Sequence, residues 1–256
     1  MSYFAAIILG IVEGVTEFLP ISSTGHLIIT ERLLALPTSD YLTSFSIIIQ
    51  LGAILAVLTV YGKRLLTSWE LMKRIAVAFV PTVLIGLAFY GVVKQLLGSP
   101  SVVLWALGIG GVLLIVFEKW YHEPADAHEN LASIPYRTAA LLGVAQSVAL
   151  IPGVSRAATT IVGGLMLGLS RRAIVEFSFL LAIPTMAAAS ALDLYKNAGS
   201  FSAGQWDTLA IGFIVSWLVA LLAIHWLLRY IRSHDFTLFG VYRIVAAIVF
   251  AFVLFK

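Results

Sequence analysis

Two carboxylates near the N-terminus have a spacing that suits a shared ligand. The segment 13–26 reads EGVTEFLPISSTGH, and Glu13 and Glu17 are four residues apart. On a helix this spacing places both side chains on one face. Two such carboxylates could bind Mg²⁺ or Ca²⁺, since Mg²⁺ often takes one or two carboxylates together with phosphate oxygens. The alternative is a structural role, in which both carboxylates are hydrogen-bonded to neighbouring helices.

The same segment contains a hydroxyl and an imidazole that could act together. Ser23 and His26 are three residues apart, so a helix would place them on one face as a nucleophile and its general base. Pro20 is expected to end the preceding helix, and Ser22 or Ser23 to cap the next one. The free N–H groups at that helix start would bind an anion. A capping serine and a structural histidine are the alternative interpretation.

A second segment, 152–160, supplies a cation. It reads PGVSRAATT, and Arg156 lies between two apolar stretches. A planar guanidinium donates paired hydrogen bonds to phosphate and stays charged when buried. Ser155 and Thr160 add hydroxyl donors, and Gly153 would let the backbone approach a ligand closely. The alternative is that Arg156 only neutralises a carboxylate of the first segment, a pairing that would also bring the two segments together.

Composition indicates a membrane protein. Apolar residues make up 61% of the 256 positions and charged residues 11%, against about 25% charged residues in soluble domains. The mean hydropathy is +1.01. Six apolar runs approach the ~20 residues that cross a bilayer; they are 41–61, 75–93, 102–117, 173–192, 209–228 and 237–255.

Charge and cysteine content exclude several other classes of protein. The formal net charge is +3, and the basic residues lie mainly in short loops between the apolar runs. That distribution is typical of a membrane protein and does not indicate nucleic-acid binding. The chain has no cysteine, so it forms no disulfide, thiolate metal site or cysteine nucleophile.

The two halves of the chain resemble each other. LGIVE at 9–13 parallels LGVAQ at 142–146, and PISS at 20–23 parallels PGVS at 152–155. Matches of Gly, Pro and Ser in one order are less common by chance in a membrane protein than matches of apolar residues. We therefore interpret the chain as the product of an internal duplication.

The duplication divides the chain into two repeats and a linker. We interpret residues 1–256 as a single membrane domain, with repeat one at about 1–120, a polar linker at about 121–135 and repeat two at about 136–256. Each repeat begins with a segment interrupted by Pro and small polar residues. Three of the long apolar runs then follow in each repeat.

The interrupted segments, 5–36 and 136–169, each contain two stretches too short to cross a bilayer, which predicts re-entrant hairpins. Three spans per repeat is an odd number, so the second repeat must run inverted. The expected fold class is an all-α integral membrane protein with two inverted-topology repeats, each a re-entrant helix hairpin plus three transmembrane helices. Interrupted helices at matching positions of such repeats indicate a ligand site near the membrane midplane.

The distribution of basic residues predicts the orientation. Of the 16 Lys and Arg residues, ten fall in loops on one side of the predicted topology, and Arg156 and Arg243 fall within membrane segments. The ten mark the cytoplasmic side by the positive-inside rule, so both termini are expected outside. The four on the other side are Arg32, Lys94, Lys196 and Lys256.

Further features of the membrane segments are interpreted as structural. Gly10 and Gly14 have the small-residue spacing that brings helices close, and packing inside the chain is favoured over a dimer seam. Four polar residues within membrane segments could line the cavity or join the repeats, and structural roles are favoured for each; they are Gln50, Glu176, Asp193 and Arg243.

The motifs resemble those of the undecaprenyl-pyrophosphate phosphatase family, also called bacitracin-resistance proteins. The resemblance covers essentially the whole chain and rests on the Glu-x-x-x-Glu pair, on LPISSTGH at 19–26 and on PGVSR at 152–156. It implies hydrolysis of undecaprenyl pyrophosphate to undecaprenyl phosphate and inorganic phosphate, which recycles the lipid carrier of cell-wall synthesis. It also implies a bacterial plasma (inner) membrane location and often a homodimer.

One stretch departs from the pattern of that family. The second motif of the family usually reads Ser-Arg-Ser-Gly, whereas this chain has Ala157 and Ala158 after Ser155 and Arg156. One hydroxyl and one flexible glycine are therefore lost from the expected phosphate-binding segment.

The residues and the resemblance together lead to a mechanistic hypothesis. The pyrophosphate would lie between the interrupted segments, with its polyprenyl tail between helices and a divalent cation, Mg²⁺ or Ca²⁺, nearby. Ser23 would attack the terminal phosphorus after His26, or a glutamate, removes its proton; attack by His26 or by an activated water is the alternative. The expected catalytic residues are Ser23, His26, Glu17, Glu13 and Arg156, the phosphate-binding residues are Arg156, Ser22, Thr24, Gly25, Gly153, Ser155 and Thr160, and the metal ligands are Glu13 and Glu17.

A different class of function is compatible with the same pattern. Inverted repeats with interrupted helices at the midplane are also the architecture of secondary carriers. The alternative function is therefore a polyprenyl-phosphate lipid flippase or an ion-coupled carrier. A carrier needs groups that bind its cargo, but it does not need a serine and a histidine one helical turn apart beside an arginine.

Overall fold

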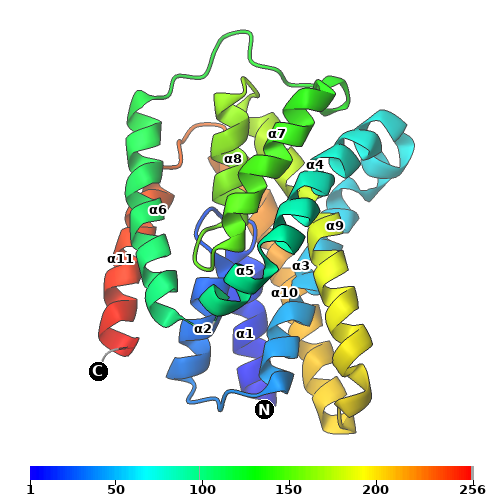
Figure 1. Ribbon diagram of the computed structural model, residues 1–256, viewed down its shortest axis with the longest axis vertical. Coiled ribbons are helices and arrows are strands. Elements are labelled where there is room, and N and C mark those ends of the chain that lie inside the picture. Colours follow the sequence, from blue (N-terminus) through cyan, green and yellow to red (C-terminus); the bar gives the residue numbers. More distant parts are fainter. Residues whose placement is uncertain (98, 255–256) are drawn as a thin grey trace.

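The computed structural model describes residues 1–97 and 99–254 and shows a bundle of helices (Figure 1). The helices in chain order are α1 (Tyr3–Thr16), α2 (Ser23–Leu33), α3 (Asp40–Thr67), α4 (Trp69–Ala88), α5 (Tyr90–Leu97), α6 (Pro100–Trp120), α7 (Tyr136–Ser147), α8 (Arg156–Met166), α9 (Arg171–Asn197), α10 (Ala203–Tyr230) and α11 (Thr237–Leu254). Short 3-10 turns are Leu131–Ser133, Val148–Leu150 and Ala198–Ser200. The all-α fold expected from the sequence is confirmed.

Five of these helices, α3, α4, α6, α9 and α10, are long and apolar enough to cross a membrane. The sixth expected span corresponds to α11, which is apolar but shorter over its described residues. Its predicted end, Phe255, lies outside the described residues, as do Lys256 and the side chain of Lys94. The expected run 75–93 is divided, because α4 ends at Ala88 and α5 follows. The multi-pass character is confirmed.

Each interrupted segment forms two helices joined by a turn, as the sequence predicted. The α1–α2 hairpin turns at residues 17–22, and the α7–α8 hairpin turns at residues 148–155. Figure 1 shows the first hairpin at the end of the molecule that carries the N-terminus, and the second at the opposite end. The two turns meet near the centre, where Arg156 pairs with Glu17. The fold therefore brings the two chemically interesting segments together.

The first helix ends earlier than expected. The sequence predicted that Pro20 ends the helix, whereas α1 ends at Thr16 and residues 17–21 form turns. A proline ring clashes with the carbonyl of the residue four positions earlier, which here is Thr16, and disfavours helical backbone at the residue before it. The helix therefore stops a full turn before the proline, and Glu17 lies where the turn begins.

Glycines allow α1 to pack tightly in the centre of the bundle, against α3 and α10. A Cβ atom at Gly10 would lie 2.7 Å from the carbonyl oxygen of Gly212. A Cβ atom at Gly14 would lie 2.7 Å from the carbonyl oxygen of Ser216. The Gly-x-x-x-Gly spacing thus serves packing inside the chain, as expected.

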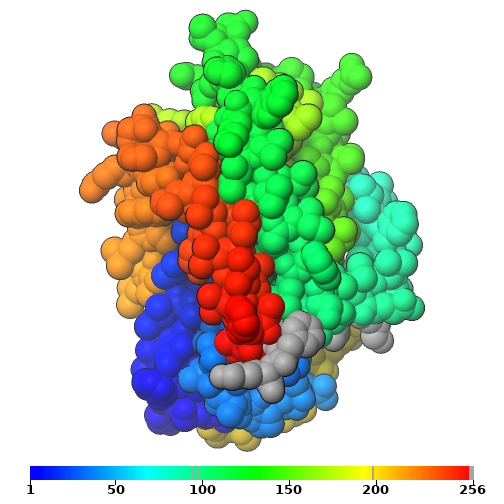
Figure 2. Space-filling view, turned by 90° about the vertical axis from the view of Figure 1, so that its left-hand side faces the viewer, coloured from blue at the N-terminus to red at the C-terminus, as the bar shows by residue number. Residues whose placement is uncertain are grey.

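The outer faces of the bundle suit a lipid environment. Helices α6 and α11 pack side by side on the face shown in Figure 2. Large apolar side chains are exposed on several helices of the bundle, including Leu113 on α6, Leu222 on α10 and Phe252 on α11. The N-terminus and the last described turns of α11 lie at the same end of the molecule (Figure 1).

Candidate active site

A cavity of about 180 Å³ lies between the two hairpin turns. Both turns contribute polar side chains to it, and α3 and α9 close it on the other sides. The lining residues are Glu17, Ser22, Ser23 and Thr24 from the first hairpin, Ala149, Val154, Ser155 and Arg156 from the second, Gln50 from α3, and Thr185, Met186 and Ala189 from α9. Six of the residues predicted from the sequence to form the site therefore share one cavity.

An ion pair connects the two hairpins inside this cavity. The Nη2 atom of Arg156 lies 3.3 Å from Oε1 of Glu17, with side chains 11% and 4% exposed. The Nη1 atom of Arg156 donates to the carbonyl oxygen of Ser178 at 2.7 Å. The pairing that the sequence allowed between Arg156 and a carboxylate of the first segment is thus observed. It also fixes the guanidinium at the wall of the cavity, where it could bind an anion.

Glu17 also accepts a hydrogen bond from the hydroxyl of Ser23 through its other carboxylate oxygen, Oε2. Ser23 is the first residue of α2, and its side chain is directed back toward the end of α1. A serine hydroxyl that donates to a carboxylate has the arrangement of a nucleophile with its general base. One carboxylate therefore joins the proposed nucleophile to the arginine.

His26 lies differently from the first expectation. Its Nδ1 atom is 2.8 Å from the carbonyl oxygen of Ser22, and its Nε2 atom is 2.8 Å from the hydroxyl of Tyr242 on α11. Both ring nitrogens are engaged with these groups, and the hydroxyl of Ser23 contacts Glu17 and not His26. The expected pairing of Ser23 with His26 is not formed, because Ser23 turns toward α1 while the imidazole stacks on the Tyr242 ring.

The contact of His26 supports an unusual backbone conformation. Ser22 has φ +70°, which non-glycine residues rarely adopt. It occupies the N-cap position of α2, but its hydroxyl makes no capping hydrogen bond. Because a carbonyl only accepts, Nδ1 of His26 donates to Ser22 and helps to hold this conformation. Strained residues of this kind cluster at functional sites.

Glu13 lies one helical turn before Glu17 and is fully buried. Both of its carboxylate oxygens lack a hydrogen-bond partner among the described residues. An unpartnered buried carboxylate requires a proton or a cation nearby. In the described part of the chain no three His, Cys, Asp or Glu residues come together as a metal site, so a cation here would need oxygens from a bound phosphate. Glu13 does not line the cavity between the turns, and both oxygens of Glu17 are engaged by Ser23 and Arg156. Binding of Mg²⁺ or Ca²⁺ by these carboxylates therefore stays a prediction.

Several residues predicted to bind phosphate are directed elsewhere. Thr160 is fully buried, and its hydroxyl donates to the carbonyl of Arg156 within α8 at 2.8 Å. Gly25 faces α6, where a Cβ atom would lie 3.1 Å from Leu107. Gly153 also packs against α6, and its φ of +89° serves the turn itself. These three residues shape the hairpins. The hydroxyl of Ser155 accepts a hydrogen bond from the backbone N–H of Ala158 and so caps α8.

Arg243 connects both hairpin turns to the neighbouring helices. Its side chain is 1% exposed and donates to the carbonyl oxygens of Pro20 and Gly153, each at 3.2 Å. It also donates to the carbonyl oxygens of Ala106 at 2.9 Å and Leu107 at 3.3 Å. The sequence favoured a structural role for Arg243, with a link between the repeats as one possibility, and these contacts with both turns agree with it. A buried arginine in a membrane helix was the available signal.

The other polar membrane residues divide into two groups. Glu176 pairs with Arg64 at 2.7 Å and Arg172 at 3.0 Å, and Asp193 accepts from Asn197 at 2.9 Å. These contacts agree with structural roles. Gln50 lines the cavity instead, which differs from the structural role that the sequence favoured.

Comparison with known proteins places this arrangement in a family. The model of the family described as bacitracin resistance protein BacA matches residues 6–249. The chain belongs to the BacA family. Relatives named undecaprenyl-diphosphatase include the proteins of Aquifex aeolicus, 49% identical, and Sulfurihydrogenibium sp., 47% identical, each matched over 98% of both chains. The protein of Wolinella succinogenes, with the same name, is 47% identical over 99% of both chains. The family resemblance found in the motifs is confirmed.

Ala157 and Ala158, at which this BacA chain departs from the family motif, lie outside the cavity. Ala157 is fully buried in the core. Ala158 donates its N–H to the hydroxyl of Ser155 at 3.2 Å and lines a neighbouring apolar groove. Neither alanine belongs to the residues that line the cavity between the turns. The two alanines therefore do not replace any of the polar residues that line the cavity.

Proposed function

We propose that this BacA protein hydrolyses undecaprenyl pyrophosphate to undecaprenyl phosphate and inorganic phosphate, and so recycles the lipid carrier of cell-wall synthesis. The observation that carries the proposal is the contact chain Ser23–Glu17–Arg156 inside one cavity. It supplies a nucleophile, a base and a cation next to one another. Relatives at 47–49% identity named undecaprenyl-diphosphatase support the substrate.

The geometry suggests the order of events. Glu17 takes the proton of Ser23 as the serine oxygen attacks the terminal phosphorus. The bond between this phosphorus and the bridging oxygen breaks, and undecaprenyl phosphate leaves. Water then hydrolyses the phosphoserine and releases inorganic phosphate. Arg156 and the N–H groups at the start of α2 stabilise the charge that develops on the phosphoryl oxygens.

A divalent cation, Mg²⁺ or Ca²⁺, is part of the proposal. Glu13 would hold it together with the neighbouring Glu17, and the buried oxygens of Glu13 that lack partners among the described residues support this. When bound, such an ion would neutralise charge on the phosphate oxygens. The protein residues bind and orient the pyrophosphate and move the proton of Ser23.

The membrane arrangement belongs to the same proposal. We assign the chain to two inverted-topology repeats in the bacterial inner membrane, with both termini outside. The two hairpins support this, because they lie at opposite ends of the molecule in Figure 1 and each has the helix–turn–helix form. The homodimer implied by the family resemblance stays a prediction, which the mass of the purified protein in detergent tests.

Release of inorganic phosphate from undecaprenyl pyrophosphate by the purified protein tests the function. Wild type should be active, and Ser23→Ala and Arg156→Ala should each lose about 10²-fold or more in kcat. Matched controls are Ser233→Ala and Arg137→Ala, which change exposed residues of the same types and should leave the rate unchanged. An inactive wild type that transfers the lipid between leaflets would contradict the proposal and favour the carrier alternative, which none of the reported relatives supports.

A further inference from the structure

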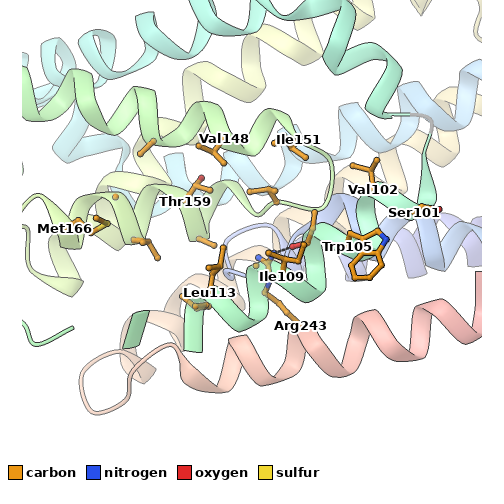
Figure 3. Close-up of a pocket in the computed structure, with 18 residues that line it drawn as sticks. Ser101, Val102, Trp105, Ile109, Leu113, Val148, Ile151, Thr159, Met166 and Arg243 are labelled. Atoms are coloured by element: carbon orange, nitrogen blue, oxygen red, sulfur yellow. Dashed lines mark hydrogen bonds between the residues drawn. The ribbon is translucent and has the colours of Figure 1, made fainter. Parts of the chain in front are cut away.

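A long apolar groove lies next to the candidate active site. It has a volume of about 660 Å³ and separates α6 from the α7–α8 hairpin (Figure 3). Ile109 and Leu113 of α6 line one side, and Val148 and Met166 line the other. Figure 3 shows these side chains between the ribbons of α6 and the hairpin. Its size lies in the range of ligand pockets, about 300–1,000 Å³.

Two polar residues in the wall of the groove, Thr159 and Arg243, are already engaged in hydrogen bonds. The hydroxyl of Thr159 donates to the carbonyl of Arg156 at 3.1 Å. The guanidinium of Arg243 donates to four carbonyl oxygens, including those of Ala106 and Gly153. A bound water needs two to four polar partners, and these engaged groups offer it few. The groove is therefore suited to hydrocarbon.

The groove adjoins the cavity that is proposed to bind the pyrophosphate. Val154 lines both spaces. It lies in the turn between Gly153, whose carbonyl binds Arg243, and Ser155, which lines the cavity. A molecule with an anionic head and a long apolar tail could thus place the head beside Arg156 and the tail along α6. A small water-soluble phosphate would leave the groove unused.

We infer that the groove between α6 and the α7–α8 hairpin binds the polyprenyl tail of the lipid whose pyrophosphate binds in the cavity. The inference rests on the proposed function and adds the location of the tail. The groove is open to lipid where Trp105 and Leu113 are 71% and 61% exposed, so the remainder of a long tail stays in the bilayer. Tail length then contributes to recognition through this groove.

Substitution of Ile109 by tryptophan tests the groove by filling it. Ile109 is 53% exposed on α6 and lies outside the polar cavity. We expect Ile109→Trp to raise KM for undecaprenyl pyrophosphate at least about tenfold and to leave kcat/KM for a five-carbon isoprenyl pyrophosphate unchanged. The matched control is Ile214→Trp on α10, where the isoleucine is 49% exposed. Equal losses on both substrates, or no change on either, would overturn the inference.

Photochemical labelling of the wild type provides a test that does not depend on a variant. The probe is an undecaprenyl pyrophosphate that carries a diazirine in its tail, and the labelled peptides are identified by mass spectrometry. Labelling concentrated in 101–114 and 145–166 is expected, since these ranges contain most of the groove wall. Labelling spread evenly over the lipid-facing helices would overturn the inference even if hydrolysis is observed. Labelling of the groove without hydrolysis would contradict the proposed function alone.

Discussion

Glu17 connects the groups on which the proposed chemistry depends. One carboxylate oxygen accepts from Ser23, and the other lies 3.3 Å from Nη2 of Arg156. The carboxylate is buried, and the arginine beside it compensates its charge. Loss of this charge would remove the base and leave the guanidinium of Arg156 without its partner at the same time.

We expect Glu17→Gln to reduce kcat for phosphate release by about 10²–10⁴-fold, because an amide cannot take the proton of Ser23. The measurement is phosphate release at saturating undecaprenyl pyrophosphate. The matched control is Glu31→Gln, since Glu31 also accepts a hydrogen bond from a serine, Ser46, at 2.7 Å but lies outside the cavity. A Glu17→Gln enzyme as fast as the Glu31→Gln enzyme would rule out Glu17 as the base.

We expect substitution of Glu13 to change the dependence of phosphate release on a divalent cation. Its oxygens have no partner among the described residues, so Glu13→Gln removes a proposed cation ligand without breaking an observed hydrogen bond. We expect the Mg²⁺ concentration for half-maximal phosphate release to rise, while thermal stability is retained or increased. Titration of Mg²⁺ into chelator-treated enzyme measures the first effect. An unchanged half-maximal concentration would show that Glu13 does not hold the cation.

The sequence was sufficient to predict most of the polar site. Spacing and residue type indicated Glu17, Ser23 and Arg156 because ionisable and nucleophilic groups in a membrane segment need partners. The orientation of His26 was not predictable. Its helical spacing from Ser23 is correct, but the choice between Ser23 and Tyr242 as partner depends on the packing of α11, which lies 216 residues further along the chain.

At the scale of elements, Arg243 connects the two hairpin turns and so fixes their positions relative to each other. It donates to carbonyls in both turns and in α6, so one side chain of α11 links three other elements. Removal of the guanidinium would leave those buried carbonyls unsatisfied, at about 1–3 kcal/mol each. The turns would also lose their shared anchor, and the cavity between them would change shape.

Arg243→Met is therefore expected to lower the free energy of unfolding by several kcal/mol and to reduce phosphate release. Thermal unfolding in detergent and the phosphate assay measure the two effects. Arg229→Met changes an exposed arginine near the end of α10 and serves as the control. If Arg243→Met unfolds at the temperature of the control and is equally active, Arg243 does not position the turns.

The helix pattern was largely predictable, but several boundaries were not. Proline and serine at matching positions indicated two hairpins, and both are present. The end of α1 at Thr16 follows from the clash of a proline ring four residues later, whereas the sequence had placed it at the proline. The division of one apolar run into α4 and α5 was missed, because hydropathy alone does not detect a bend between two apolar helices.

At the scale of the whole molecule, the ends of the chain define an orientation that experiment can test. The N-terminus lies at the end of the molecule opposite the polar linker 121–135 (Figure 1). The excess of Lys and Arg on the linker side predicts that this side is cytoplasmic. The groove beside the site was not predictable at this scale, since its wall is assembled from three helices and one distant arginine.

The absence of cysteine makes the orientation simple to measure. We expect Ser2→Cys to react with a membrane-impermeant maleimide in intact spheroplasts, because both termini are placed outside. Asp126→Cys, in the linker, should react only after the membrane is permeabilised. The opposite pattern would invert the proposed topology.

The central claim is that Ser23, activated by Glu17 and next to Arg156, forms the bond to the terminal phosphate. The most direct test is to quench the enzyme with acid during turnover of undecaprenyl pyrophosphate and to locate phosphate on the protein by mass spectrometry. We expect phosphoserine at Ser23 in the wild type and its loss in Ser23→Ala, together with the loss of activity. A Ser23→Ala enzyme that still releases phosphate at the wild-type rate would contradict it.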